Sequence, residues 1–259
     1  MPIAKRPPAN FSALRYGVFS LLGFIVLWWL SAKLAASPQL LPSPGKVIAV
    51  TWQQILNGEM PRNVGITLLR VLAAFGLAMA IGSAAGYLAG RSPRANALMN
   101  PWLIITLNLP VLVVIILAFI WIGLNEAAAV LAVVIAKIPT VMVTVREGAQ
   151  ALDPGLDEVA VIYRLPQLRR LQRIVLPQLA PYLAAAGRSG LSITWKIVLI
   201  VELMGRPNGV GFELNVFFQA FDVAGVLAYG FSFAAIMLLI ETAILQPWER
   251  HVNAWRRNA

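Results

Sequence analysis

Cysteine and charge are what this chain of 259 residues has least of: it contains no cysteine, and only 12% of its residues are charged. The lack of cysteine excludes disulfides, thiolate metal sites and a cysteine nucleophile. Histidine occurs once, and no G-x-x-x-x-G-K-[ST] phosphate-binding loop is present. The chain therefore has no evident means of hydrolysing ATP, and we expect no catalytic, cofactor-binding or metal-binding residue in it.

Apolar residues dominate the chain instead. Hydrophobic residues make up 59% of it, and the mean hydropathy of +0.75 lies outside the range of soluble domains. This composition predicts an all-α integral membrane protein, because a helical crossing takes about 20 residues and the length leaves room for several. The net charge of +10 is typical of basic loops on the cytoplasmic side of a membrane. Nucleic-acid binding is not indicated, since there is no soluble basic domain.

Uncharged or nearly uncharged stretches predict about six transmembrane helices, at residues 16–32, 66–90, 102–122, 127–145, 182–201 and 223–245. We take 16–245 as one transmembrane domain, with a polar segment at each end, 1–15 and 246–259. The first stretch is too long for the core of a signal peptide, so we expect it to stay as a helix. A short amphipathic helix is predicted between the first two spans, and an irregular or re-entrant loop at 202–222.

A ridge of small residues marks the second span. Small side chains recur there at every fourth position, at Ala74, Ala78, Gly82, Gly86 and Gly90. Such a ridge lets two helix backbones approach closely in lipid, where packing replaces hydrophobic attraction. We therefore predict that this face of the span packs against another helix.

Polar residues inside the spans are candidates for a translocation path, because they are costly in lipid and normally face protein or water. The proline of the third span also predicts a break in the helix. The candidates are Asn108 and Pro110 in the third span, Lys137 in the fourth, and Arg188, Ser192 and Lys196 on one face of the fifth. A structural role is the alternative: the cations can support packing, snorkel to the interface, or pair with Glu202 and Glu241.

Basic residues set the orientation of the spans. Six spans place both termini on the same side, and that side then holds most of the arginines and lysines of the connecting segments. The other side holds Lys33, Lys46, Arg62 and Arg206. We therefore expect both termini, and the segment 153–177, to lie in the cytoplasm.

The segment 153–177, DPGLDEVAVIYRLPQLRRLQRIVLP, is the polar exception in the chain. Its Asp-Pro start predicts a short helix, and its two later prolines predict the bounds of a second one with an apolar face and an arginine-rich face. A basic segment of this kind can lie on anionic lipid. Asp157 and Glu158 beside an apolar face instead favour a groove on a cytoplasmic partner.

In this segment the sequence resembles the permease subunits of ATP-binding cassette importers, specifically the nitrate, sulfonate and taurine branch. The loop of that family reads Glu-Ala-Ala, three residues, Gly, nine residues, then Ile-x-Leu-Pro. Here Glu158, Val159 and Ala160 are followed at the same spacing by Arg164 and by IVLP at 174–177. Arg164 departs from the family, which has glycine at this bend between two helices.

The resemblance covers roughly residues 40–257. Besides the loop, it includes the stretches LLPSPGKV at 40–47, TLLRVLAAF at 67–75, NPWLIITLNLP at 100–110, WIGLNE at 121–126, TWKIVLIVELMG at 194–205 and NGVGFELN at 208–215. The resemblance implies a fold like that of type I importers and a multi-pass protein of the bacterial cytoplasmic (inner) membrane. It also implies that the loop couples the permease to an ATPase through Asp157, Glu158, Val159, Ala160, Tyr163, Arg164, Leu168, Ile174, Leu176 and Pro177.

The partners implied by the resemblance are a second permease subunit as a homodimer, two ATPase subunits that carry ATP and Mg, and an extracytoplasmic solute-binding protein. The implied solute is a small anion such as nitrate, sulfonate or taurine. Similar importers carry thiamine precursors or other small organic solutes, so these stay as alternatives within the same family.

Two other functions fit parts of the sequence. An ion-coupled secondary transporter would use the ionisable residues inside the spans, although six spans with no inverted repeat make a small protomer. An intramembrane serine protease is suggested by the G-x-S-G pattern at 187–190. Such a serine needs a base, usually histidine, and His251 lies in the tail predicted to be cytoplasmic.

Overall fold

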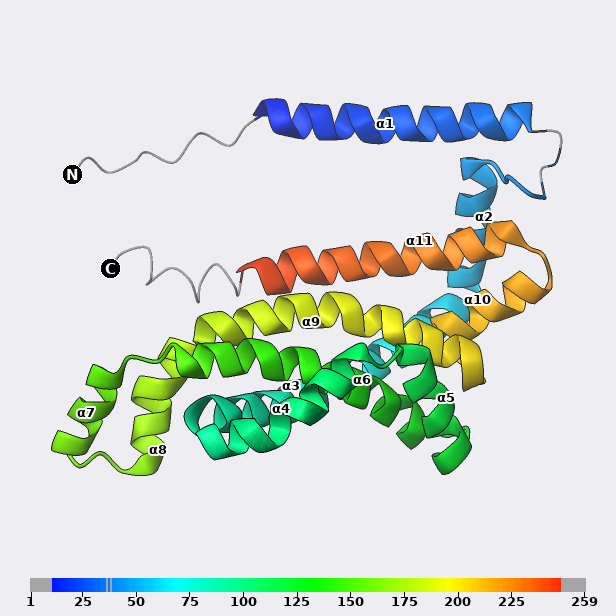
Figure 1. The fold of residues 1–259 in the computed structure, drawn as a ribbon. Coiled ribbons are helices and arrows are strands. Elements are labelled where there is room, and N and C mark those ends of the chain that lie inside the picture. The colour runs from blue at the N-terminus through cyan, green and yellow to red at the C-terminus, as the bar shows by residue number, and fades with distance from the viewer. Residues whose placement is uncertain (1–10, 36, 38, 248–259) are drawn as a thin grey trace.

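The structure is a computed structural model that describes residues 11–35, 37 and 39–247. Within these residues every regular element is a helix (Figure 1), as the composition predicts. Most of the two predicted polar ends, 1–15 and 246–259, lies outside the described residues. The helices long and apolar enough to cross a membrane include α1 (Phe11–Leu34), α3 (Glu59–Arg91), α6 (Glu126–Gln150), α9 (Leu176–Gly205) and α11 (Val223–Ile240).

The third predicted span consists of two helices, α4 (Pro93–Asn108) and α5 (Val111–Ile122), which meet at a bend of 99°. The predicted break at Pro110 is confirmed, although the helical pair begins at Pro93 and not at residue 102. Proline lacks an amide hydrogen and disfavours helical backbone in the residue before it. Leu109 is accordingly extended, with φ −74° and ψ 128°. Counted as one bent span, the pair completes the predicted six.

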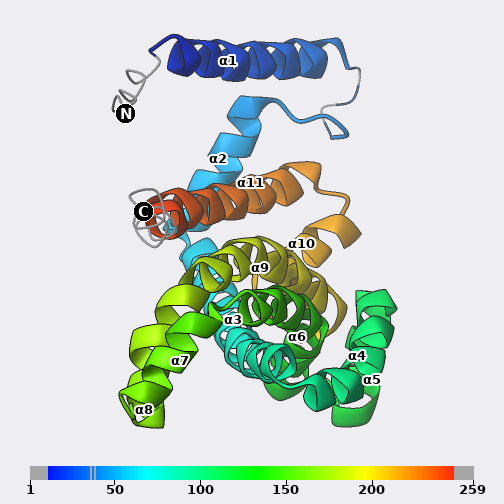
Figure 2. The same cartoon turned by 60° about the vertical axis from the view of Figure 1, so that its left-hand side comes forward.

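α3, α6 and α9 pack side by side as the core of the molecule, whereas α1 lies apart from them (Figure 2). The small-residue ridge of α3 faces α6. A Cβ on Gly82 would lie 2.8 Å from the Cβ of Val141, and one on Gly86 would lie 2.6 Å from the carbonyl oxygen of Met142. The predicted packing role of the ridge is confirmed.

The prediction that the second helix of the segment 153–177 ends at Pro177 is wrong. α8 (Gln167–Arg170) continues through a π-turn at Leu171–Val175 into α9, so that 167–205 form one helical stretch. In the π-turn the N–H of Leu176 donates to the carbonyl of Leu171, one residue further back than in an α-helix. This wider turn accommodates the ring of Pro177, which would otherwise clash with a carbonyl of the preceding turn.

Two shorter helices lie at the opposite end of the molecule from α8. The predicted amphipathic helix between the first two spans is α2 (Pro44–Leu56), capped by the Ser43 hydroxyl. The predicted irregular loop at 202–222 is only partly irregular, because it contains α10 (Val210–Gln219). Gly209, at φ +105°, turns the chain into α10, and a Cβ on Gly211 would lie 2.2 Å from the carbonyl oxygen of Leu199. Glycine therefore allows α10 to contact α9 directly.

α7 (Pro154–Ile162) and α8 project from one end of the bundle. The first turn of α1 and the last turn of α11 point toward this same end, and α2 and α10 lie toward the other (Figure 1). The predicted topology, with the segment 153–177 on the side of both termini, agrees with this arrangement.

Candidate functional site

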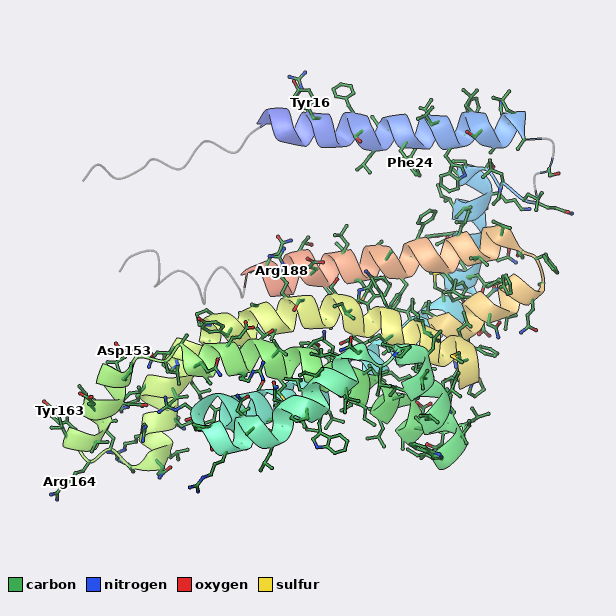
Figure 3. All side chains as sticks on the ribbon, in the orientation of Figure 1. Tyr16, Phe24, Asp153, Tyr163, Arg164 and Arg188 are labelled. Carbon is green, nitrogen blue, oxygen red and sulfur yellow. The ribbon has the colours of Figure 1, made fainter. Side chains whose placement is uncertain are left out.

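The protruding pair of helices is the first candidate site, and we call residues 153–177 the α7–α8 hairpin. The Asp153 carboxylate accepts a hydrogen bond from the N–H of Gly155 at 2.8 Å, which confirms the predicted helix start. The N–H of Asp153 donates to the side chain of Gln178 on α9 at 2.9 Å. Figure 3 shows Tyr163 and Arg164 at the tip of the hairpin, away from the bundle.

The tip of the hairpin exposes a cluster of large apolar side chains. Ile162 is 74% exposed, Tyr163 75% and Leu168 65%. Contiguous exposed apolar side chains at a protrusion are typical of a surface that binds a partner. Of the ten residues predicted to couple the permease to an ATPase, those on the hairpin surface are Glu158, Val159, Tyr163, Arg164, Leu168, Leu176 and Pro177.

The other three predicted coupling residues hold the hairpin together. Asp157 forms ion pairs with Arg91 at the end of α3 and with Arg170 of α8, the latter at 3.0 Å. Ala160 is 2% exposed, and Ile174 is half-buried. Asp157 is therefore bound within the chain, whereas Glu158 is exposed on α7.

The bend at Arg164 has a defined geometry. The N–H of Leu165 donates to the carbonyl of Ala160 at 2.9 Å, and the N–H of Arg164 donates to that of Val161 at 3.0 Å. These two bonds are the Schellman ending of a helix, in which the residue at the C′ position adopts left-handed backbone. Arg164 is that residue, with φ +48°. The bend thus needs the conformation that glycine adopts most readily, and here an arginine adopts it.

The predicted path residues on α9 and α4 do not converge on one point. Asn108 donates to the carbonyl of Ile104 on its own helix at 2.8 Å. Lys196 is exposed, 5.5 Å above the ring of Trp195. Arg188 lies between α9 and the end of α11 (Figure 3), where its Nε is 3.7 Å from the carboxylate of Glu241. The proposed pairing with Glu241 is therefore confirmed for Arg188.

These polar side chains lie on an outward face of α9. Arg188, Ser189 and Lys196 are exposed in the single chain, and Ser192 is half-buried. The shared face predicted for them exists, but within one chain it does not enclose a path. Pro110 is exposed at the break between α4 and α5.

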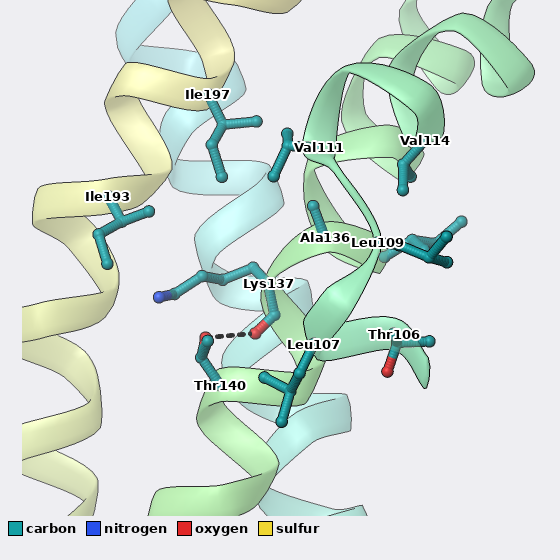
Figure 4. Close-up of a pocket in the computed structure, with 11 residues that line it drawn as sticks. Thr106, Leu107, Leu109, Val111, Val114, Ala136, Lys137, Thr140, Ile193 and Ile197 are labelled. Atoms are coloured by element: carbon teal, nitrogen blue, oxygen red, sulfur yellow. Dashed lines mark hydrogen bonds between the residues drawn. The ribbon is translucent and has the colours of Figure 1, made fainter. Parts of the chain in front are cut away.

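Lys137 differs from the other path candidates because it is 2% exposed. It lines a cavity of about 170 Å³ where the α4–α5 break meets α6 and α9. Figure 4 shows its side chain extending from α6 toward Ile193 of α9, and the hydroxyl of Thr140 donating to its carbonyl. The lining residues are Thr106, Leu107, Leu109, Val111, Val114, Ile135, Ala136, Lys137, Thr140, Ile193 and Ile197.

A buried ionic network lies away from the hairpin, in the half of the bundle near α10. The guanidinium of Arg70 on α3 lies 2.7 Å from Glu202 on α9 and 2.6 Å from Glu126 at the start of α6. Glu202 is fully buried. Its carboxylate also accepts from the hydroxyl of Thr67 at 2.9 Å and from the N–H of Gly211 at 2.8 Å.

The sequence prediction missed this network and instead considered Glu202 as a partner for the cations of the fifth span. A signal was present: an arginine within a span needs a carboxylate nearby. Arg70 stands eleven residues into α3, and Glu126 and Glu202 stand near the matching ends of α6 and α9. α3 and α6 run parallel and α9 runs antiparallel to both, and only this packing brings the three residues to the same depth.

Comparison with known proteins decides the family. Residues 78–246, which include the α7–α8 hairpin, match the family model of the binding-protein-dependent transport system inner membrane component. The chain belongs to this family. It is the permease subunit of an ATP-binding cassette importer and a multi-pass membrane protein, and permease subunits of this family are not themselves catalytic.

Relatives of this permease match nearly its whole length. SsuC of Bacillus subtilis, a permease assigned to the transport of aliphatic sulfonates, is 26% identical over 99% of this chain and 93% of its own. The taurine transport system permease protein TauC of Escherichia coli is 25% identical over 88% of this chain and 86% of its own. Among solved structures, a chain of an amino acid ABC transporter crystallised with histidines matches 77% of the permease and 96% of itself. The TM-score of 0.62 at 17% identity shows that the fold is shared.

The G-x-S-G pattern at 187–190 does not form a protease site in the described residues. The hydroxyl of Ser189 donates to the carbonyl of Ala185 on its own helix at 3.0 Å. Gly190 has a packing role, because a Cβ there would lie 3.1 Å from the ring of Phe75. His251, the base considered for that hypothesis, lies outside the described residues.

Proposed function

We propose that the permease imports a small organic anion of the sulfonate type, and that its α7–α8 hairpin couples this import to ATP hydrolysis on a separate subunit. One observation carries the coupling role. The hairpin presents an exposed apolar tip and is joined without a break to α9 through the π-turn. A displacement of the tip is therefore transmitted directly to α9, a helix of the core.

The proposed solute has support from the relatives. SsuC of Bacillus subtilis and TauC of Escherichia coli bear names that refer to aliphatic sulfonates and taurine, and both match most of this chain. Both solutes carry a sulfonate group. Nitrate and thiamine precursors, which the resemblance also allowed, have no support from these two relatives.

The proposed transporter contains two copies of the permease, two ATPase subunits with ATP and Mg, and an extracytoplasmic solute-binding protein. The polar outward face of α9 supports a permease dimer, because charged side chains at that depth in a membrane need protein or water around them. The family description supports the binding protein. We place the hairpin and both termini in the cytoplasm, on the side that the basic residues favour.

Site-directed cross-linking tests the coupling role, because the chain has no cysteine of its own and an introduced one is unique. We expect Tyr163→Cys, at the tip of the hairpin, to cross-link to the ATPase subunit in membranes from cells that express the whole transporter. Asn57→Cys, an exposed position after α2 at the other end, is the matched control and should not cross-link.

Two results would contradict the proposal. One is cross-linking of the ATPase through Asn57→Cys with none through Tyr163→Cys. The other is uptake into vesicles that contain the permease without any ATPase, driven by an ion gradient alone, which would instead establish an ion-coupled secondary transporter.

A further inference from the structure

The cavity beside the α4–α5 break contains one charged group in an otherwise nearly apolar wall. Of the described residues that line it, Lys137 alone is charged, and the hydroxyls of Thr106 and Thr140 are the polar side chains. Both hydroxyls already donate to backbone carbonyls, of Trp102 at 2.8 Å and of Lys137 at 2.9 Å. Lys137 is therefore the side chain of this wall with hydrogens to offer a ligand.

The ammonium of Lys137 has no hydrogen-bond or ion-pair partner among the described residues. Three carboxylates in or at the ends of the spans have other partners: Glu202 and Glu126 pair with Arg70, and Glu241 pairs with Arg188. A buried cation without a counter-charge is costly, and a residue of this kind inside a membrane protein indicates a functional site.

The chain makes room for this lysine. Its side chain passes close to α9, where a Cβ on Gly190 would lie 3.5 Å from the Cε of Lys137 and 3.1 Å from the ring of Phe75. The proline break between α4 and α5 opens the opposite wall, so that the ends of both helices border the cavity. Two features of the sequence, a glycine in α9 and a proline after α4, therefore shape the space around one cation.

We infer that this cavity is a solute-binding site, in which Lys137 binds a sulfonate or carboxylate head group and the aliphatic wall contacts a short apolar tail. The inference rests on the proposed import function and adds to it the site and the selectivity. A volume of about 170 Å³ is smaller than the roughly 300–1,000 Å³ of pockets for drug-sized ligands, which suits a solute of a few carbon atoms. An inorganic oxyanion would leave the wall of Leu107, Leu109, Val111 and Ile197 without an apolar partner.

A solute-binding site at Lys137 predicts how substitutions there change the binding of ethanesulfonate. We would measure binding of radiolabelled ethanesulfonate to the complete transporter in lipid nanodiscs, by equilibrium dialysis, with the solute-binding protein absent. Lys137→Gln should weaken binding by at least about tenfold, because a charge-assisted hydrogen bond is lost. Lys137→Arg should keep most of it, and Lys46→Gln, which removes a cation from the exposed surface of α2, should leave it unchanged.

Competing ligands test the head group and the tail separately. Butyrate should displace ethanesulfonate, whereas neutral ethanesulfonamide and tail-less nitrate should each do so at least about tenfold less well, since the first lacks the charge and the second the apolar contact. Three results would contradict the solute-binding site: binding to the Lys137→Gln transporter equal to that of the wild type, competition by ethanesulfonamide equal to that by butyrate, or no saturable binding to the wild type.

The failure of this inference can be told from failure of the proposed function. If Tyr163→Cys cross-links to the ATPase but Lys137→Gln binds ethanesulfonate normally, the coupling role holds and the proposed solute-binding site is wrong. If Asn57→Cys cross-links to the ATPase and Tyr163→Cys does not, the proposed coupling role is wrong irrespective of what the cavity binds.

Discussion

At the scale of single residues, Arg164 shows how far the sequence reaches. The spacing from Glu158 to 174–177 located the bend between two short helices, and the family pattern marked position 164 as unusual. The sequence could not give the φ of +48°, because that angle is set by the Schellman bonds of Leu165 and Arg164 itself. The structure thereby supplies the physical reason for the family glycine: the bend requires left-handed backbone.

We predict that Arg164→Gly is tolerated. Glycine removes a backbone cost of about 1–2 kcal/mol for a left-handed residue, partly offset by its greater freedom in the unfolded chain, about 0.5–1 kcal/mol. The free energy of unfolding of the purified permease should therefore rise by no more than about 1.5 kcal/mol, and the ATPase should still co-purify. Tyr163→Gly is the control, because its φ of −81° gives glycine no advantage and the permease should lose stability. Loss of ATPase association in Arg164→Gly would show that the arginine has a contact of its own.

Arg70 illustrates what sequence reasoning missed. Its charge inside a span was visible, but the partners Glu126 and Glu202 are 56 and 132 residues away in the chain. The sequence prediction instead considered Arg188 and Lys196 as partners for Glu202. Only the packing of α3 against α6 and α9 selects Arg70.

Removing Arg70 should strongly destabilise the permease. Arg70→Met leaves Glu202 fully buried without its cation, and breaking a buried pair in this way costs about 3–5 kcal/mol. Thermal unfolding in detergent is the measurement. Arg62→Met, on the exposed face of the same helix, should change stability by no more than about 0.5 kcal/mol. Equal stability of the two variants would mean that the ionic network contributes nothing to the fold.

At the scale of helices, the sequence predicted features that depend on local residue chemistry better than features that depend on packing. The small-residue ridge of α3, the break at Pro110 and the helix start at Asp153 follow from local chemistry, and all are confirmed. The continuation of α8 into α9 past Pro177 does not follow from it, because a π-turn leaves no signature in residue type. α10 was missed because four glycines and prolines precede or open it, while its helix depends on contacts with α9.

The ridge gives a direct test of α3–α6 packing. Gly86→Ala should cost about 1–3 kcal/mol through overpacking, since its Cβ would lie 2.6 Å from the carbonyl oxygen of Met142. Gly76→Ala on the same helix meets no atom within 4 Å and should be neutral or stabilising by up to about 1 kcal/mol. The comparison is made by thermal unfolding, and a less stable Gly76→Ala than Gly86→Ala would contradict the packing.

At the scale of the whole molecule, composition and charge already indicate a multi-pass helical membrane protein. The arrangement of α1, α11 and the α7–α8 hairpin toward one end (Figure 1) agrees with that topology. The Lys137 cavity depends on side chains from α4, α5, α6 and α9, so the sequence could name Lys137 as a path candidate without locating the space around it. The hairpin and the cavity are joined by α9, which runs from the π-turn past Ile193 and Ile197.

The measurement that tests the central claim most directly is ATP-driven uptake by the Glu158→Lys permease. Glu158 is exposed on α7, and Asp157 is bound to Arg91 and Arg170, so this reversal changes the docking surface and leaves the hairpin's own ion pairs in place. Glu147→Lys, an exposed acid near the end of α6, is the matched control. We predict that Glu158→Lys abolishes uptake of ethanesulfonate while the permease reaches the membrane at the wild-type level, and that Glu147→Lys keeps it. Normal uptake by Glu158→Lys would contradict the coupling role of the hairpin.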